Sequence, residues 1–433
     1  MELLERIQNK TAKVAIIGLG YVGLPLAVEI AAEGFDVTGF ELDAEKIRNI
    51  NEGISYISDV ENETLISVVG KGLLKATEDF SMLGECQIVV ICVPTPLDRF
   101  KQPDLSFIDK VTDQVKKYMQ KGTLVILEST TYPGTTEEIL KPAFESSGQK
   151  VGEDFFLVFS PERVDPGNKI YRTKNIPKIV GGCSEKCATL AKAFYGSFLE
   201  APVHIVSSPK EAEMTKIYEN TFRVVNCALA NEMAIICDKL GINIWEVIDA
   251  ASTKPFGFMP FYPGPGVGGH CIPIDPFYLS YRARAVDSHT RFIELAGEIN
   301  DAMPAYVASR ITDLLNSFGK PVKGSKILLM GISYKADIDD LRESPALAVW
   351  DILEAKGAKV FYHDPYCPLV KRNGINVPSV ALVKELVESC DVVVITAAHK
   401  TRVNYEMIKQ HAKAVLDTKN TIMDKEASNV YLL

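Results

Sequence analysis

The chain has 433 residues, 47% of them hydrophobic, and its formal net charge is −9. This length predicts two or three domains, each with its own core. The negative charge argues against a nucleic-acid partner and against binding to an anionic membrane surface. No stretch approaches the length of a membrane span, and residues 1–13 hold acids and bases but no long apolar run, so we expect no membrane segment and no secretion signal.

Nine cysteines are scattered along the chain, mostly within apolar segments. Their odd number and lack of a tight framework predict reduced thiols and a cytoplasmic protein. Cys183 and Cys187 have a loose spacing and the six histidines are dispersed, so we expect no metal site.

The N-terminal region is typical of a dinucleotide-binding unit. An apolar run, 14–17, leads into the turn Gly18-Leu-Gly-Tyr-Val-Gly23 and then into a predicted helix over 24–32. A second predicted strand, 36–40, ends at Glu41. The glycines would let a pyrophosphate reach the helix N-terminus, and Glu41 would bind the adenosine ribose hydroxyls and repel a 2′-phosphate. This order predicts NAD rather than NADP; the alternative is a glycine turn that serves helix packing alone.

Further apolar strands alternate with helical patterns up to about residue 205. The strands are predicted over 87–93, 123–127, 155–159 and 178–180. This alternation predicts a parallel sheet with helices on both faces.

Polar loops follow three of these strands. They are Pro94-Thr-Pro96, Ser129-Thr-Thr-Tyr-Pro-Gly134 and Ser160-Pro-Glu-Arg163. In an open α/β sheet, the loops at the carboxyl ends of the strands line the ligand crevice. We therefore expect ligand contacts from these loops; the alternative is ordinary turn chemistry.

A long helix is predicted after Ser208-Pro-Lys-Glu211, a capping box with proline at the first helical position. Neither glycine nor proline recurs before Gly241, so the helix is long enough to join two domains or to form an oligomer interface. Lys216 and Asn220, four positions apart, share one face of it. One interpretation is a solvated stripe; the other is a buried pair that stabilises an oxyanion or holds a catalytic water.

The segment Gly264-Pro-Gly-Val-Gly-Gly-His-Cys-Ile-Pro-Ile-Asp-Pro276 places Cys271 and Asp275 four residues apart, behind a run of glycines. The glycines would leave room for a bulky ligand, and Pro273 would open a helix. A cysteine near a helix N-terminus favours the thiolate and becomes a better nucleophile, while Asp275 would handle a proton or a water. The alternative is a turn with a buried, inert cysteine.

The last third repeats the plan of the first. A strand and turn are predicted at 326–331, a helix over 344–356 and a strand over 359–363. The turn lacks the other glycines, but Lys335 and Arg342 follow it. We expect a Rossmann relative that binds a different ligand, such as a nucleotide diphosphate; the alternative is that both residues are surface charges. The predicted fold class is α/β, with two Rossmann-like doubly wound parallel-sheet domains joined by a long central helix.

These residues resemble the UDP-glucose/UDP-N-acetylhexosamine dehydrogenase family over nearly the whole chain, most specifically at Gly-Gly-His-Cys271. The resemblance implies NAD-dependent oxidation of the C6 alcohol of a UDP-sugar to a carboxylate. It also implies a homodimer or higher homo-oligomer. The implied domains are an NAD-binding domain over 1–205, a central helical dimerisation domain with the cysteine loop over 206–310, and a UDP-binding domain over 311–433.

The resemblance also implies residue roles. Catalytic roles are implied for Cys271 as the thiol, Lys216 and Asn220 as the oxyanion and water-handling pair, Asp275 as their companion, and Thr130 and Glu162 near the reacting carbon. Cofactor contacts are implied for Gly18, Gly20, Tyr21, Val22, Gly23, Glu41, Thr95, Thr130 and Arg342, the last from a neighbouring subunit. Substrate contacts are implied for Glu162, Arg163, Lys216, Asn220, Lys254, Tyr262, Gly268 and Lys335.

The residue before the cysteine bears on the substrate. Glucose-specific members commonly have a small residue there, whereas this chain has His270. With residues 253–264, this pattern looks like the N-acetylhexosamine branch, and within it like UDP-N-acetylglucosamine 6-dehydrogenases. UDP-N-acetylmannosamine and UDP-glucose enzymes are alternatives.

The chemistry accounts for a cysteine in such a site. Oxidation of an alcohol to an acid removes two hydrides, so the intermediate aldehyde must be retained, and a thiol retains it as a thiohemiacetal and then a thioester. The alcohol would be deprotonated by Lys216 or by a water that Thr130 and Asp275 hold, and Glu162 is the candidate for hydrolysis. A single-hydride hydroxyacid dehydrogenase would form one NADH per substrate instead of two, and an NAD-binding scaffold would form none.

Overall fold

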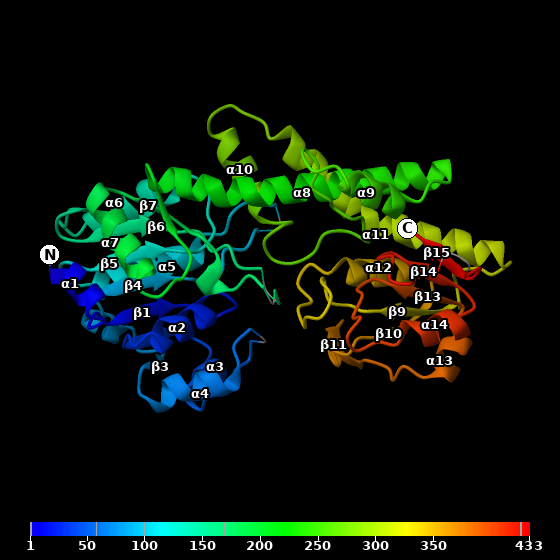
Figure 1. Ribbon diagram of the computed structural model, residues 1–433, viewed down its shortest axis with the longest axis horizontal. Helices are drawn as coiled ribbons and strands as arrows, with labels where there is room; N and C mark the ends of the chain where they lie inside the picture. The colour runs from blue at the N-terminus through cyan, green and yellow to red at the C-terminus, as the bar shows by residue number, and fades with distance from the viewer. Residues whose placement is uncertain (1, 58, 99, 166, 169, 425–426) are drawn as a thin grey trace. The chain divides into compact units, whose positions relative to one another are not determined.

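The computed structural model describes residues 2–57, 59–98, 100–165, 167–168, 170–424 and 427–433. The chain divides into two compact units (Figure 1). The first comprises Met1–Glu219 with Tyr281–Ser288, and the second comprises Asn220–Ser280 with His289–Leu433. Each unit is built around its own sheet.

The sheet of the first unit has the strand order β3-β2-β1-β4-β5-β6-β7-β8. Its strands are β1 (Val14–Ile17), β2 (Val37–Phe40), β3 (Leu74–Thr77), β4 (Ile88–Ile91), β5 (Leu124–Leu127), β6 (Phe156–Phe159), β7 (Lys178–Gly182) and β8 (Val203–Val206). The ladders from β3 to β6 are parallel, as expected, whereas β7 pairs antiparallel with β6. The order of the first six strands is that of a Rossmann fold, in which the chain reverses its direction across the sheet between β1 and β4.

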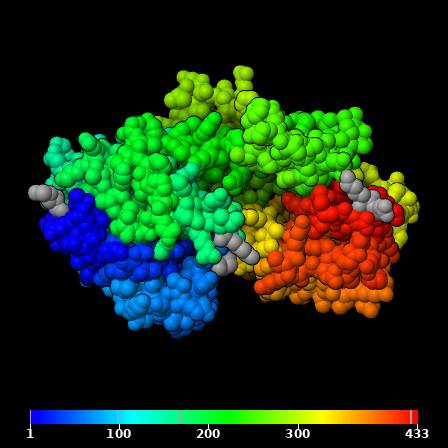
Figure 2. Space-filling view, viewed as in Figure 1, coloured from blue at the N-terminus to red at the C-terminus, as the bar shows by residue number. Residues whose placement is uncertain are grey.

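Helices cover both faces of this sheet. They are α1 (Glu2–Gln8), α2 (Gly23–Ala32), α3 (Ala44–Asn51), α4 (Asn62–Gly70), α5 (Ser106–Tyr118), α6 (Lys141–Glu145) and α7 (Glu185–Gly196). Successive strand residues point to opposite faces. Ile16 and Val90 therefore pack in one apolar cluster with α2 and α7, while Ile17 and Ile91 pack in a second cluster with α5 and α6. Figure 2 shows these segments, blue to green, as one closely packed body.

The long helix, α8 (Pro209–Leu240), has 32 residues and begins and ends where the sequence predicts. The Ser208 hydroxyl accepts a hydrogen bond from the Lys210 N–H and contacts the Glu211 carboxylate. Gly241 adopts a φ of +69°, the left-handed conformation that commonly ends a helix. The helices that follow are α9 (Ile244–Ser252), α10 (Asp275–Arg284) and α11 (Arg291–Ser317).

The sheet of the second unit is parallel, with the order β10-β9-β13-β14-β15. Its elements are β9 (Lys326–Met330), α12 (Pro345–Ala355), β10 (Lys359–His363), α13 (Lys384–Ser389), β13 (Val392–Ile395), α14 (Tyr405–His411), β14 (Val415–Asp417), β15 (Val430–Leu432) and a hairpin, β11 (Leu369–Arg372) with β12 (Ile375–Pro378). Leu329 and Val394 pack against α11 and α12, and Leu328 and Val393 pack against α13 and α14. The second Rossmann-like domain is thus confirmed.

Candidate active site

The turn after β1 contains three glycines that differ in what surrounds them. Gly18 has a φ of +90°, and a Cβ on it would lie 2.7 Å from the Cys92 carbonyl oxygen. A Cβ on Gly23 would lie 1.8 Å from the Gly18 carbonyl oxygen, whereas one on Gly20 would have nothing within 4 Å. Gly18 and Gly23 are therefore required by the protein's own packing, and Gly20 leaves open space for a ligand at the N-terminus of α2. Tyr21 and Val22 complete this turn, and both are partly buried.

Glu41 lies at the carboxyl end of β2, beside the glycine turn. One oxygen of its carboxylate accepts a hydrogen bond from the Leu19 N–H at 3.2 Å, and the other accepts one from the Leu42 N–H at 2.9 Å. Thr95, which follows β4, is 4% exposed. The strand, turn, helix and acid therefore meet the geometric demands of a dinucleotide site.

The loop after β5 carries Thr130 and is attached to α8 by a buried glutamate. The Glu213 carboxylate accepts hydrogen bonds from the Gly134 N–H at 2.6 Å, the Thr136 N–H at 2.9 Å and the Thr136 hydroxyl at 2.7 Å. Burial raises the pKa of Glu213 to about 7, against the lowering effect of these hydrogen bonds. Sequence reasoning missed Glu213, although it lies one helical turn before Lys216 on the same helix.

The loop after β6 brings Glu162 to Lys216. The Glu162 carboxylate accepts hydrogen bonds from the N–H groups of Arg163 and Val164, both at 2.7 Å, and its main-chain oxygen accepts one from Lys216 Nζ at 2.6 Å. Arg163 forms a two-point ion pair with Glu219. Lys216 is 8% exposed, so it is a buried residue and not part of a solvated stripe. Since the Glu162 carboxylate is engaged in shaping its own loop, its main chain is what reaches Lys216.

The next turn of α8 holds the other half of the predicted pair. Asn220 Nδ2 donates a hydrogen bond to Asp275 Oδ2 at 2.6 Å, and these residues are 8% and 2% exposed. The Asp275 N–H in turn bonds to the Cys271 carbonyl oxygen at 2.8 Å. Cys271 is exposed. The helix opens at Asp275 and not at Pro273 as expected, because residues 271–274 form a turn that places Cys271 just before it.

The glycines before Cys271 accommodate the protein's own chain. A Cβ on Gly268 would lie 2.6 Å from the Glu343 carbonyl oxygen, and one on Gly269 would lie 2.9 Å from the Tyr334 ring. The Gly269 N–H also bonds to the Arg342 carbonyl oxygen at 3.0 Å. At 268 and 269 the absence of a side chain therefore makes room for the loop that follows β9.

The remaining predicted substrate residues, and Arg342, which is predicted to contact the cofactor, lie on two segments of the second unit. The Arg342 guanidinium pairs with the Asp340 carboxylate at 2.6 Å, and the Lys335 carbonyl oxygen accepts a hydrogen bond from the Ser333 hydroxyl at 2.7 Å. Lys254 Nζ lies 4.9 Å from the centre of the Phe256 ring. Tyr262 is 46% exposed and donates to Asp249 at 2.7 Å. These contacts hold the side chains of Arg342 and Tyr262 in place, and none of them links Lys254 or Tyr262 to Lys335.

Sequence reasoning also missed Lys419, which follows β14. A Cβ on Gly264 would lie 2.3 Å from Lys419 Nζ, so this ammonium lies against the glycine segment before Cys271. Burial lowers the pKa of Lys419, although Cys227 and Asp417 oppose the effect. Its position after a strand of the second sheet was a signal, because polar residues at that edge bind ligands.

The two Rossmann-like sheets and the glycine turn after β1 are those of a nucleotide-binding α/β protein. The chain belongs to the UDP-glucose/GDP-mannose dehydrogenase family. The NAD binding domain of that family matches residues 12–199, its central domain 210–302, and its UDP binding domain 328–424.

Two relatives frame the substrate question. The chain is 40% identical to the UDP-N-acetyl-D-glucosamine 6-dehydrogenase of Pseudomonas aeruginosa over 82% of this chain and 83% of that protein. It is 35% identical to the UDP-N-acetyl-D-mannosamine dehydrogenase of Pyrococcus horikoshii over 97% of this chain and 98% of that protein. A solved structure of the UDP-D-ManNAc dehydrogenase from Pyrococcus horikoshii superposes with a TM-score of 0.88, covering 97% of this chain and 98% of that chain.

The cofactor prediction is confirmed: the chain is an NAD-dependent UDP-sugar dehydrogenase. In the described part of the chain, no group of three or more metal-ligating side chains occurs. Within the same residues, no helix is long and apolar enough to cross a membrane.

Proposed function

We propose that this enzyme oxidises the C6 alcohol of UDP-N-acetylglucosamine to the carboxylate, with two NAD consumed per sugar. The observation that carries the proposal is the exposed Cys271 next to the buried Asn220–Asp275 pair. The sugar is chosen because the relative that is 40% identical carries that name. UDP-N-acetylmannosamine is the second candidate, because relatives that are named for it align over 97% of this chain.

The chemistry assigned to Cys271 keeps the half-oxidised sugar on the enzyme. NAD accepts one hydride at a time, so the alcohol reaches the acid in two oxidations. Between them the Cys271 sulfur adds to the C6 aldehyde to give a thiohemiacetal. The second oxidation converts it to a thioester, and water then hydrolyses the carbon–sulfur bond, releasing the carboxylate and restoring the thiol.

The polar residues around α8 would handle charge and protons in these steps. Lys216 and Asn220 stabilise the oxygen of the tetrahedral intermediates, and one well-placed donor is worth about 3 kcal/mol. Asp275 orients the Asn220 amide through the bond between their side chains. Either Lys216 or a water held by Thr130 and Asp275 removes the alcohol proton. We assign Glu162 to the hydrolysis step through the position it gives Lys216.

The binding residues divide between the nucleotides. Gly18, Gly20, Tyr21, Val22, Gly23, Glu41, Thr95 and Thr130 contact NAD, and Arg342 contacts the NAD of a neighbouring subunit. Arg163, Lys254, Tyr262, Gly268 and Lys335 contact the UDP-sugar. We add Lys419, because a buried ammonium that lies against the glycine segment before Cys271 suits a diphosphate. We further propose a cytoplasmic homodimer, built from domains 1–205, 206–310 and 311–433.

The decisive experiment is a substrate screen with the intact protein. UDP-N-acetylglucosamine, UDP-N-acetylmannosamine and UDP-glucose are each supplied with excess NAD, and the NADH formed is compared with the sugar consumed. We expect a ratio of two, with the highest kcat/KM for UDP-N-acetylglucosamine. A ratio of one would contradict the thioester route. A higher kcat/KM for UDP-N-acetylmannosamine would replace the proposed substrate by the second candidate.

A further inference from the structure

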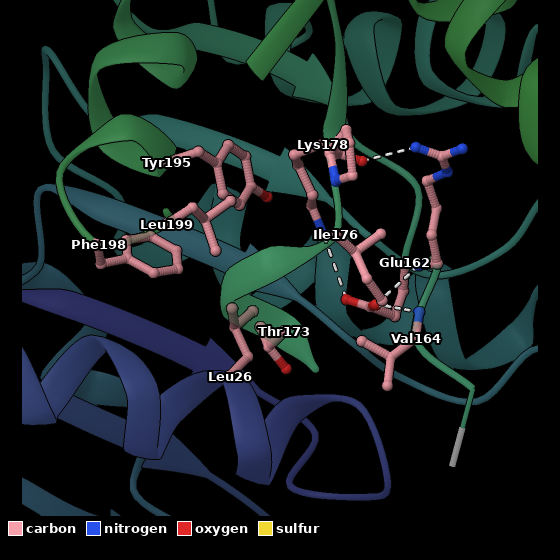
Figure 3. A pocket seen from close by; sticks show the side chains of 11 residues that line it. Leu26, Glu162, Val164, Thr173, Ile176, Lys178, Tyr195, Phe198 and Leu199 are labelled. Atoms are coloured by element: carbon pink, nitrogen blue, oxygen red, sulfur yellow. Dashed lines mark hydrogen bonds and ion pairs between the residues drawn. The ribbon is translucent and has the colours of Figure 1, made fainter. Parts of the chain in front are cut away.

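A chain of buried charges runs through the first unit beneath the Glu162 loop. Lys178 Nζ lies 3.0 Å from Glu128 Oε1 and 3.2 Å from Glu162 Oε2. The side chains of Lys178, Glu128 and Glu162 are 8%, 0% and 14% exposed. The Tyr195 hydroxyl donates a hydrogen bond to the same Glu128 oxygen. Figure 3 shows Lys178 and Glu162 facing each other on the wall of a small pocket that Tyr195 also lines.

Lys178 acts on the pKa of both neighbouring glutamates. Burial raises the pKa of Glu162, but Lys178, the Val164 N–H and Lys216 together outweigh it, and the pKa is lowered. The pKa of Lys178 is raised, because the two glutamates outweigh its burial. The pKa of Glu128 is raised by burial, which Lys178 offsets only in part. The titratable groups that face Glu162 are Lys178 on β7, Glu128 after β5, Lys216 on α8 and Cys92 after β4.

The ionised Glu162 carboxylate has a structural consequence at Lys216. It accepts the N–H groups of Arg163 and Val164, and so fixes the backbone of the loop that follows β6. That same loop presents the Glu162 carbonyl oxygen to Lys216 Nζ at 2.6 Å. A protonated Glu162 would lose its ion pair with Lys178 and weaken its hold on both N–H groups, and the carbonyl oxygen would no longer be fixed.

We propose that Lys178 is a positioning residue of this enzyme: it holds the Glu162 carboxylate, and through the loop backbone it fixes the ammonium group of Lys216. The inference rests on the proposed function for the role of Lys216. Stability alone is a weak reason for such a group, because a buried ion pair can often be replaced by apolar residues without loss of stability.

The test compares Lys178→Met with Lys178→Arg, and with Lys174→Met as the matched control. Lys174 also bridges two glutamates of the first unit, Glu29 and Glu33, but makes no contact with Glu162. In Lys178→Met we expect kcat to fall at least tenfold at pH 7, the KM for NAD to stay within twofold, and the acid limb of the kcat profile to move to higher pH. Lys178→Arg should restore most of the loss, and Lys174→Met should keep the wild-type profile.

A second, near-isosteric variant should shift the acid limb in the opposite direction. It keeps the proposal testable even if Lys178→Met does not fold. Glu128→Gln removes one negative charge, so Lys178 acts on Glu162 alone, and the acid limb should move to lower pH. An unchanged acid limb of the kcat–pH profile in both Lys178→Met and Glu128→Gln would overturn the proposal. Equal losses of kcat in Lys178→Met and Lys178→Arg, without a shift of that limb, would overturn it as well. Failure of the proposed function is seen separately, as a wild-type protein that forms no NADH with any UDP-sugar.

Discussion

Cys271 differs from the other cysteines in its surroundings. Among the nine cysteines, all of which lie in the described residues, Cys271 is exposed and the other eight are buried or half-buried. Burial raises the pKa of the Cys86 thiol to about 12 and also raises that of Cys390, so such thiols are poor nucleophiles at neutral pH. Selective alkylation by iodoacetamide is therefore expected at Cys271.

Replacing this sulfur should stop the second half of the reaction. Cys271→Ser should lower kcat on the order of a thousandfold or more. The serine hydroxyl is a weaker nucleophile than the thiol, and its ester is hydrolysed more slowly than a thioester. Intact-mass spectrometry of the protein should detect a trapped ester-linked or aldehyde-level species. Cys237→Ser, at a half-buried cysteine of α8, serves as the control and should turn over normally. Normal turnover of Cys271→Ser would remove the nucleophile assignment.

Glu213 should make stability depend on pH. Its pKa in the folded protein is raised to about 7 from the ordinary value of 4.5. The folded state thus binds the proton more tightly, and this contribution to stability is complete below about pH 4.5 and lost as the pH rises through about 7. The shift corresponds to on the order of 3 kcal/mol.

The comparison is therefore between wild type and Glu213→Gln. The free energy of unfolding of the wild type should fall more steeply from pH 5 to pH 8 than that of Glu213→Gln, measured by denaturant titration. Glu153→Gln, at a side chain that is 64% exposed, should keep the wild-type slope. Parallel slopes in all three proteins would show that Glu213 is already ionised at pH 5.

At the scale of residues, the sequence predicts the roles that depend on neighbouring positions in the chain. Cys271 and Asp275 are recognisable because their spacing and glycine context lie within one segment. Lys178 and Glu213 are not, since each acquires its role from partners far along the chain, as Lys178 does from Glu128 and Glu162. Their own neighbours in the sequence carry no sign of that pairing.

At the scale of elements, the turn after β1 contains one glycine that should matter for ligand binding and another that the packing of the turn requires. A Cβ on Gly20 would have no atom within 4 Å, whereas a Cβ on Gly23 would overlap the Gly18 carbonyl oxygen at 1.8 Å. Gly20→Ala should therefore fold with a normal melting temperature but bind NAD at least tenfold more weakly, because the methyl group would occupy the space for the pyrophosphate. Gly23→Ala should lower the melting temperature itself.

The two measurements are differential scanning fluorimetry without NAD and a fluorescence titration with NAD. Gly70→Ala is the control for glycine replacement as such, since a Cβ there also has nothing within 4 Å and the residue ends α4. A Gly20→Ala protein with wild-type NAD affinity would place the pyrophosphate elsewhere.

The predicted elements succeeded where apolar runs are continuous. Buried strands such as β4 and β5 have four fully buried residues in succession, which is typical of a sheet covered on both faces. The edge strand β3 escaped prediction because Lys75 interrupts it and points to solvent. The antiparallel ladder between β6 and β7 could not be predicted, since strand direction depends on the path of the connection and not on the residues of either strand.

At the scale of the whole molecule, the proposed dimer implies that exposed apolar side chains of α8 lie in the interface between the subunits. Phe222, Leu229 and Ile236 are spaced seven residues apart, so they lie on one face of the helix, and they are 45%, 52% and 43% exposed. On α11, Phe292 and Leu295 are 76% and 54% exposed. Large apolar side chains in such a stripe are typical of an obligate interface between subunits.

A charge in the middle of this stripe should therefore dissociate the protein. Leu229→Glu would bury a carboxylate without a partner in the proposed interface, which costs several kcal/mol and should raise the dimer dissociation constant at least a hundredfold. Sedimentation velocity then gives the mass of one chain instead of two at micromolar concentration. Ile375→Glu, on the hairpin strand β12 and 67% exposed, introduces the same charge outside the stripe and should leave the dimer intact. A Leu229→Glu protein that sediments like the wild type would move the interface away from α8.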